Sequence, residues 1–173
     1  MNILQLFKNI TTFIFDVDGV LTDGTVLVLE DGVQARRMNI KDGLALQMAV
    51  KNGYKVLIVS GGNSPEVVNR LEKLGITDIH MSVFDKQAFV SAYMTKNNLS
   101  KGQVLFMGDD LPDLPAMSLV GLPVCPADAV TEVKEFVQYI SPLNGGEACV
   151  REVIEKVLKL NDHWNYRADV TSR

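Results

Sequence analysis

Residues 12–19 read TFIFDVDG, an apolar run that ends on two carboxylates one residue apart. Short, nearly continuous apolar runs are typical of strands that are covered on both faces of a parallel sheet. Similar runs at residues 55–59 and 103–107 end at Ser60 and at Gly108, and a shorter run covers residues 122–125. These four runs predict buried parallel strands.

Helical patterns lie between and after these runs, at residues 43–52, 86–97 and 148–160. A further helix is expected to begin at Pro65, after Ser64, and to be closed by Gly75. Alternation of strands and helices predicts an α/β fold with a doubly wound, mainly parallel, Rossmann-like sheet.

Residues 25–30 and 33–38 interrupt this alternation, because two extended runs flank Asp31-Gly32. An Asp-Gly pair between such runs favours a β-hairpin with a type I′ turn, in which both central residues have positive φ. We expect a hairpin over residues 25–38, inserted after the first strand of one domain that spans residues 1–160. Residues 161–173 are expected to form a polar C-terminal tail.

The composition excludes several functions. The chain has 173 residues, 17 Lys+Arg against 21 Asp+Glu, and a net charge of -4, so binding to nucleic acid through bulk positive charge is not expected. No apolar run approaches the roughly 20 residues of a membrane span, and the N-terminus does not resemble a secretory signal, so we expect a cytoplasmic protein. With two Cys and two His, a metal must be held by oxygen ligands, which favours Mg²⁺ or Ca²⁺.

Reactive side chains follow the predicted strands, and the carboxyl ends of parallel strands meet at one edge of a sheet. Asp16 and Asp18 follow the first strand, Ser60 the second and Asp109 the third, while Lys86 opens a helix. This set suits phosphoryl transfer, in which a carboxylate attacks phosphorus and Mg²⁺ offsets the charge. A second carboxylate then serves as general acid and base. Taken singly, each residue could instead be a turn, a cap or a surface side chain.

The motifs resemble those of the haloacid dehalogenase superfamily of phosphohydrolases. They are Asp-x-Asp-Gly at residues 16–19, Ser60, Lys86, and Gly-Asp-Asp-x-x-Asp at residues 108–113. Residues 16–24, 39–43 and 145–153 further resemble a capless subgroup that acts on sugar-acid phosphates. The resemblance implies that no separate cap domain is present.

The resemblance also implies roles for individual residues. Asp16 would be the nucleophile and Asp18 the general acid and base. Mg²⁺ would be held by Asp16, the Asp18 carbonyl and Asp109, with Asp110 beside it or bound through water. The remaining implied contacts are phosphate binding by Ser60, Gly61 and Lys86, and substrate binding by Arg70, Lys73, Gly145 and Gly146.

Members of this subgroup form homotetramers in which a neighbouring subunit completes each active site, so Gly145 and Gly146 would approach that neighbour. The implied substrate is an eight-carbon keto-deoxy sugar-acid phosphate, which Gly62 favours over a nine-carbon acid 9-phosphate. A receiver-like phospho-switch is an alternative of another class. The order of the residues argues against it, because the acidic pair Asp109-Asp110 follows a late strand.

Overall fold

β1 (Thr12–Phe15) lies at the centre of a six-stranded sheet in the order β5-β4-β1-β6-β7-β8, and every strand pairing in it is parallel. The computed structural model describes residues 2–165, so most of the tail expected at residues 161–173 lies outside the described residues. The other strands of the sheet are β4 (Lys55–Val59), β5 (Asp78–His80), β6 (Val104–Met107), β7 (Leu122–Cys125) and β8 (Tyr139–Ile140).

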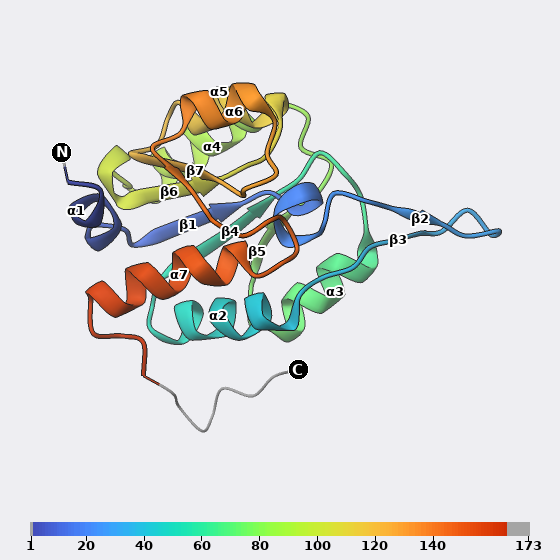
Figure 1. Ribbon diagram of the computed structural model, residues 1–173, viewed down its shortest axis with the longest axis horizontal. Coiled ribbons are helices and arrows are strands. Elements are labelled where there is room, and N and C mark those ends of the chain that lie inside the picture. The colour runs from blue at the N-terminus through green and yellow to red at the C-terminus, as the bar shows by residue number, and fades with distance from the viewer. Residues whose placement is uncertain (1, 166–173) are drawn as a thin grey trace.

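Helices cover both faces of the sheet, as Figure 1 shows. One face carries α2 (Ile40–Lys51), α3 (Pro65–Lys73) and α7 (Cys149–Leu160), and the other carries α4 (Lys86–Lys96), α5 (Leu114–Met117) and α6 (Thr131–Phe136). The shorter segments are α1 (Ile3–Lys8), the wound turn η1 (Val17–Leu21), η2 (Lys101–Gln103) and η3 (Leu111–Asp113). Within residues 2–165, no helix is long and apolar enough to cross a membrane.

Side chains of β1 alternate between the two layers of the core. Phe13 and Phe15 pack with α2, α3 and α7, whereas Ile14 packs with α4 and α5. All three are fully buried. The doubly wound sheet predicted from the apolar runs is therefore confirmed, and it fixes Asp16 at the edge where β1 ends.

The hairpin is present but shorter than expected. Its paired strands are β2 (Leu27–Val28) and β3 (Gln34–Ala35), which form a separate antiparallel sheet. The predicted type I′ turn is wrong: Gly32 has a φ of +82°, but Asp31 does not have a positive φ. Gly32 N–H donates to the Leu29 carbonyl, so the chain reverses in a three-residue loop that places only glycine in the left-handed region.

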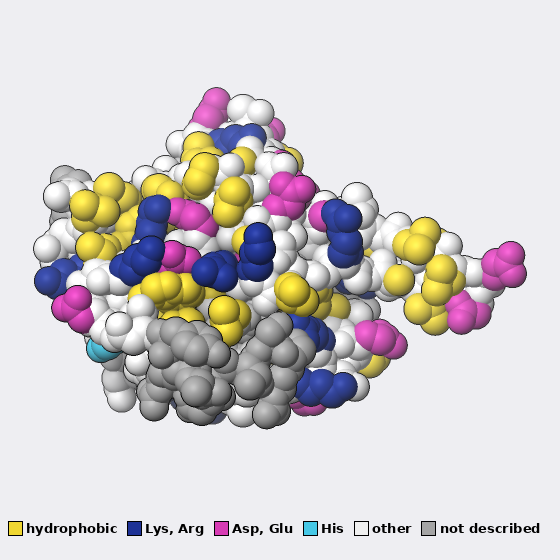
Figure 2. Space-filling view, turned by 60° about the horizontal axis from the view of Figure 1, so that its bottom comes forward, with side chains coloured by type: hydrophobic (Ala, Val, Ile, Leu, Met, Phe, Trp, Pro, Cys, Tyr) yellow, Lys and Arg dark blue, Asp and Glu magenta, His cyan; other side chains and the backbone are white. Residues whose placement is uncertain are grey.

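The hairpin projects away from the body of the molecule (Figure 1). Its apolar side chains face solvent: Leu27 and Val28 are each 65% exposed, and Val33 is 44% exposed. Figure 2 shows hydrophobic side chains gathered along this projection, with acidic side chains at its tip. A strand pair of this size is marginal by itself, so its stability depends on what covers it.

Candidate active site

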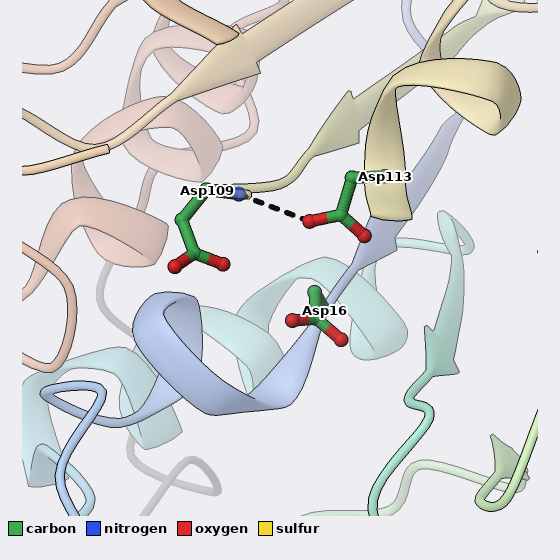
Figure 3. A group of neighbouring side chains, drawn as sticks. All are labelled: Asp16, Asp109 and Asp113. Atoms are coloured by element: carbon green, nitrogen blue, oxygen red, sulfur yellow. Dashed lines mark hydrogen bonds between the residues drawn. The ribbon is translucent and has the colours of Figure 1, made fainter. Parts of the chain in front are cut away.

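Three carboxylates meet at the carboxyl edge of the sheet. Asp16 follows β1, Asp109 follows β6, and Asp113 ends η3. One oxygen of each lies within 4.8 Å of the others, and Figure 3 shows the three side chains gathered around one space. Asp113 Oδ2 accepts a hydrogen bond from the Asp109 N–H at 3.1 Å, which fixes the turn between β6 and η3.

Lys86 supplies the positive charge of this cluster. It opens α4, where the Asp85 side chain caps the helix by accepting from Ala88 N–H. Its ammonium donates to Asp16 Oδ1 at 2.8 Å and to Asp113 Oδ1 at 2.6 Å. Because all three side chains are buried, the ion pairs are shielded from water.

The cluster carries more negative charge than Lys86 neutralises. Burial, with the nearby Asp113 carboxylate, raises the pKa of Asp16 to about 7. Burial, followed by the charges of Asp16, Asp113 and Asp110, raises the pKa of Asp109 to about 8. The Asp109 Oδ1 atom is buried and has no hydrogen-bond partner. An all-oxygen site with an unpartnered carboxylate oxygen fits a hard divalent cation such as Mg²⁺.

Asp110 and Asp113 differ in what their side chains do. Asp110, the expected neighbour of the metal, lines the same cavity as Asp16 and Asp109, and its carboxylate accepts from Leu111 N–H at 2.7 Å and caps η3. Its metal role stays a prediction. Asp113, which the sequence reasoning left without a role, also points into the cluster. The signal was present in the Gly-Asp-Asp-x-x-Asp motif, because one turn of helix brings its last carboxylate back towards its first.

Asp18 lies on η1, directly beyond Asp16. Gly19, with a φ of +88°, lets this turn pass close to Asp109, where a Cβ would lie 2.0 Å from Oδ2. The Gly19 N–H donates to Thr22 Oγ1 at 3.3 Å, which ties the turn together. The Asp18 carboxylate contacts Arg36, a residue that the sequence reasoning missed because the two are 18 positions apart.

Ser60 and Gly61 join the acidic cluster at one cavity of about 430 Å³. Ser60 is buried at the end of β4, and its Oγ accepts from Gly62 N–H at 3.1 Å. Lys86 also lines this cavity. The structure thus brings the expected nucleophile, acid and phosphate-binding side chains to one site, while their roles stay predictions.

The expected substrate-binding residues do not line this cavity. Arg70 lines a neighbouring cavity of about 320 Å³ between β3 and α3, and Lys73 lies exposed at the end of α3. Gly145 and Gly146 pack against η1 of their own chain: a Cβ on Gly145 would lie 2.0 Å from the Gly19 carbonyl oxygen. Their expected contact with a neighbouring subunit stays a prediction.

Comparisons with known proteins agree with this geometry. Residues 75–154 match the family model described as haloacid dehalogenase-like hydrolase. The curated 3-deoxy-D-manno-octulosonate 8-phosphate phosphatase KdsC of Yersinia pestis is 31% identical over 161 residues, covering 93% of this chain and 86% of the relative.

Two solved structures are similar to the whole fold. The Yersinia pestis phosphatase has a TM-score of 0.90 at 31% identity, covering 93% of this chain and 87% of that one. The Moraxella catarrhalis phosphatase, solved in complex with magnesium ion, phosphate ion and a KDO molecule, has a TM-score of 0.88 at 32% identity, covering 92% of each chain. The chain therefore belongs to the 3-deoxy-D-manno-octulosonate 8-phosphate phosphatase family of haloacid dehalogenase-like hydrolases.

Proposed function

We propose that this protein is a Mg²⁺-dependent phosphatase that hydrolyses 3-deoxy-D-manno-octulosonate 8-phosphate to KDO and phosphate through an aspartyl-phosphate. The observation that carries the proposal is the arrangement of Asp16, Asp109, Asp113 and Lys86 at the end of β1. The similarity to phosphatases of that name supports the choice of substrate.

In the first step, an oxygen of Asp16 forms a bond to phosphorus, and the bond from phosphorus to the sugar oxygen breaks. Asp18 donates a proton to the departing oxygen. In the second step, Asp18 takes a proton from water, the water oxygen bonds to phosphorus, and the bond to Asp16 breaks. Phosphate leaves, and both carboxylates return to their starting states.

The remaining site residues have binding roles in this proposal. Ser60, Gly61 and Lys86 hold the phosphate oxygens, since they line the same cavity as Asp16. The residues that would hold Mg²⁺ are Asp16, the Asp18 carbonyl and Asp109, with Asp113 or Asp110 beside them. When bound, Mg²⁺ offsets the repulsion between the Asp16 carboxylate and the phosphate.

Binding of the sugar-acid part of the substrate is assigned to Arg70 and, secondarily, to Lys73. Arg70 is supported by its cavity beside the site. Gly145 and Gly146 are also assigned to substrate binding, because their loop packs closely against η1, which carries Asp18. A nine-carbon keto-deoxy acid 9-phosphate is the alternative substrate.

We also propose a homotetramer in the cytoplasm, with each site completed by a neighbouring subunit. The exposed apolar side chains of the hairpin support an assembly, because an uncovered apolar strand pair is unfavourable in water. Light scattering at a series of concentrations tests it: a stable monomer with full activity would refute the shared site. Cell fractionation tests the location.

Phosphate release in Mg²⁺ tests the function, with KDO 8-phosphate, a nine-carbon acid 9-phosphate and phenyl phosphate compared side by side. Asp16→Asn is the control, and we expect it to fold but to release no phosphate. A strong preference for KDO 8-phosphate supports the proposal. Equal and slow release from all three would refute the substrate, and retained activity in Asp16→Asn would refute the nucleophile.

A further inference from the structure

Arg36 contacts the carboxylate of Asp18 with two of its nitrogens. Nε donates to Oδ1 at 2.6 Å and Nη2 donates to Oδ2 at 3.4 Å. The Arg36 side chain is only 8% exposed, whereas that of Asp18 is 39% exposed. Arg36 follows β3, so the contact joins the hairpin to the turn that carries Asp18.

The surroundings of this pair hold the guanidinium in place. Nη1 of Arg36 donates to the Gln34 carbonyl at 3.3 Å, which ties the side chain to the backbone of the hairpin. Gly62 faces the pair from the end of β4. A Cβ on Gly62 would lie 2.9 Å from Asp18 Oδ2 and 3.7 Å from Arg36 Nη2, so the missing side chain leaves room for the ion pair.

The two reacting carboxylates are thus oriented by different cations. Asp16 is oriented by the Lys86 ammonium, which comes from α4 in the body of the fold. Asp18 is oriented by Arg36, which comes from the projecting hairpin. A planar guanidinium that meets a carboxylate at both oxygens restricts its rotation, which a single point charge does not.

We propose that Arg36 is a positioning residue that aims Asp18 at the leaving-group oxygen. This inference rests on the proposed function, since it assigns Asp18 the proton transfer. In the donating form the proton is on Oδ2, which has the longer contact of 3.4 Å, while Oδ1 stays held by Nε at 2.6 Å. Without Arg36, the partly exposed Asp18 side chain rotates, and proton donation becomes slow. Attack by Asp16 is unaffected, because Arg36 does not contact Asp16 among the interactions of the described residues.

The test separates proton donation from attack by changing only the leaving group. Phenolate is a poor leaving group that needs a proton, whereas 2,4-dinitrophenolate leaves without one. The kcat/KM values of phenyl phosphate and 2,4-dinitrophenyl phosphate are measured in Mg²⁺ for the full chain. Asp18→Asn sets the scale for complete loss of the acid.

For Arg36→Gln we expect kcat/KM to fall about 10- to 100-fold with phenyl phosphate, and less than about 3-fold with the dinitrophenyl ester. Arg36→Lys is expected to recover part of the loss, because lysine keeps the charge but not the two-nitrogen contact. Arg37→Gln is the matched control: Arg37 is adjacent, 77% exposed and paired with Asp23, so both rates should stay at the wild-type level.

Equal losses with both esters in Arg36→Gln, or no loss with either, would overturn the proposal. Melting temperatures identify a variant that fails to fold. If Arg36→Gln does not fold, the ratio of the kcat/KM losses with the two esters is measured in the milder Arg36→Lys and decides the question. The wild-type rate on KDO 8-phosphate, measured alongside, reports on the proposed substrate separately. The ratio of the two aryl esters therefore remains decisive for Arg36 even if KDO 8-phosphate is not the substrate.

Discussion

Replacing Gly145 by alanine tests whether the loop before α7 supports the turn that carries Asp18. The new Cβ would lie 2.0 Å from the Gly19 oxygen and 2.9 Å from the Thr22 oxygen, both of them backbone atoms that cannot rotate away. The two segments must then separate by at least 1.0 Å, to a contact of 3.0 Å or more. Such overpacking costs about 1–3 kcal/mol.

The separation also breaks the hydrogen bond from Gly146 N–H to the Val20 carbonyl, now 3.0 Å long. Its loss adds about 1 kcal/mol, which brings the total to about 2–4 kcal/mol. For a domain of this size, the melting temperature should fall by about 4–16 °C. Because η1 moves with this contact, we expect kcat to fall by about 10-fold or more.

Differential scanning fluorimetry and phosphate release measure the two effects. Gly102→Ala is the matched control, because a Cβ on Gly102 meets nothing within 4 Å and its φ is not positive. We expect that control to melt and turn over like the wild type. If Gly145→Ala matched Gly102→Ala in both measurements, the support that the loop gives to η1 would be disproved.

Two further predictions concern buried charges. Lys86→Met leaves the buried carboxylates of Asp16 and Asp113 unpaired, so without Mg²⁺ its free energy of unfolding should drop by about 3–5 kcal/mol, whereas Lys96→Met at the exposed end of α4 should change little. Urea unfolding measures both, and equal midpoints would contradict the prediction. Burial raises the pKa of Asp42 from 3.8 to about 6, so the stability that its neutral form provides is lost as the pH rises through about 6. As the pH rises from about 5 to about 7.5, the free energy of unfolding of the wild type should therefore fall by about 1–2 kcal/mol relative to that of Asp42→Asn. Urea midpoints of the two proteins that stay parallel across this range would refute the argument.

The strands could be predicted, and so could the gathering at one edge of the sheet of the residues that follow them, because both follow from local patterns. Apolar runs mark buried strands, and parallel strands bring Asp16, Ser60 and Asp109 to one edge whatever the loops do. The position of Lys86 followed from the same rule, since α4 begins at that edge.

The missed features depend on how loops fold back. Arg36 meets Asp18 only because the hairpin returns to the body, and nothing near Arg36 in the sequence specifies that return. Asp113 shares one motif with Asp110, and only the fold of the η3 turn brings its carboxylate to those of Asp16 and Asp109. Gly145 could be recognised as a site of close approach, but its contact with its own η1 depends on the path of the whole chain.

The hairpin has two open edges. Among the described residues, β2 and β3 pair only with each other, so the outer edge of each strand forms no ladder with another strand, although Arg36 occupies the Gln34 carbonyl. An exposed strand pair that also carries apolar side chains is a template for aggregation. In the proposed homotetramer, neighbouring subunits cover this ribbon. A newly made chain would be vulnerable until they do, and a high yield of active protein would require assembly to be faster than unspecific strand pairing.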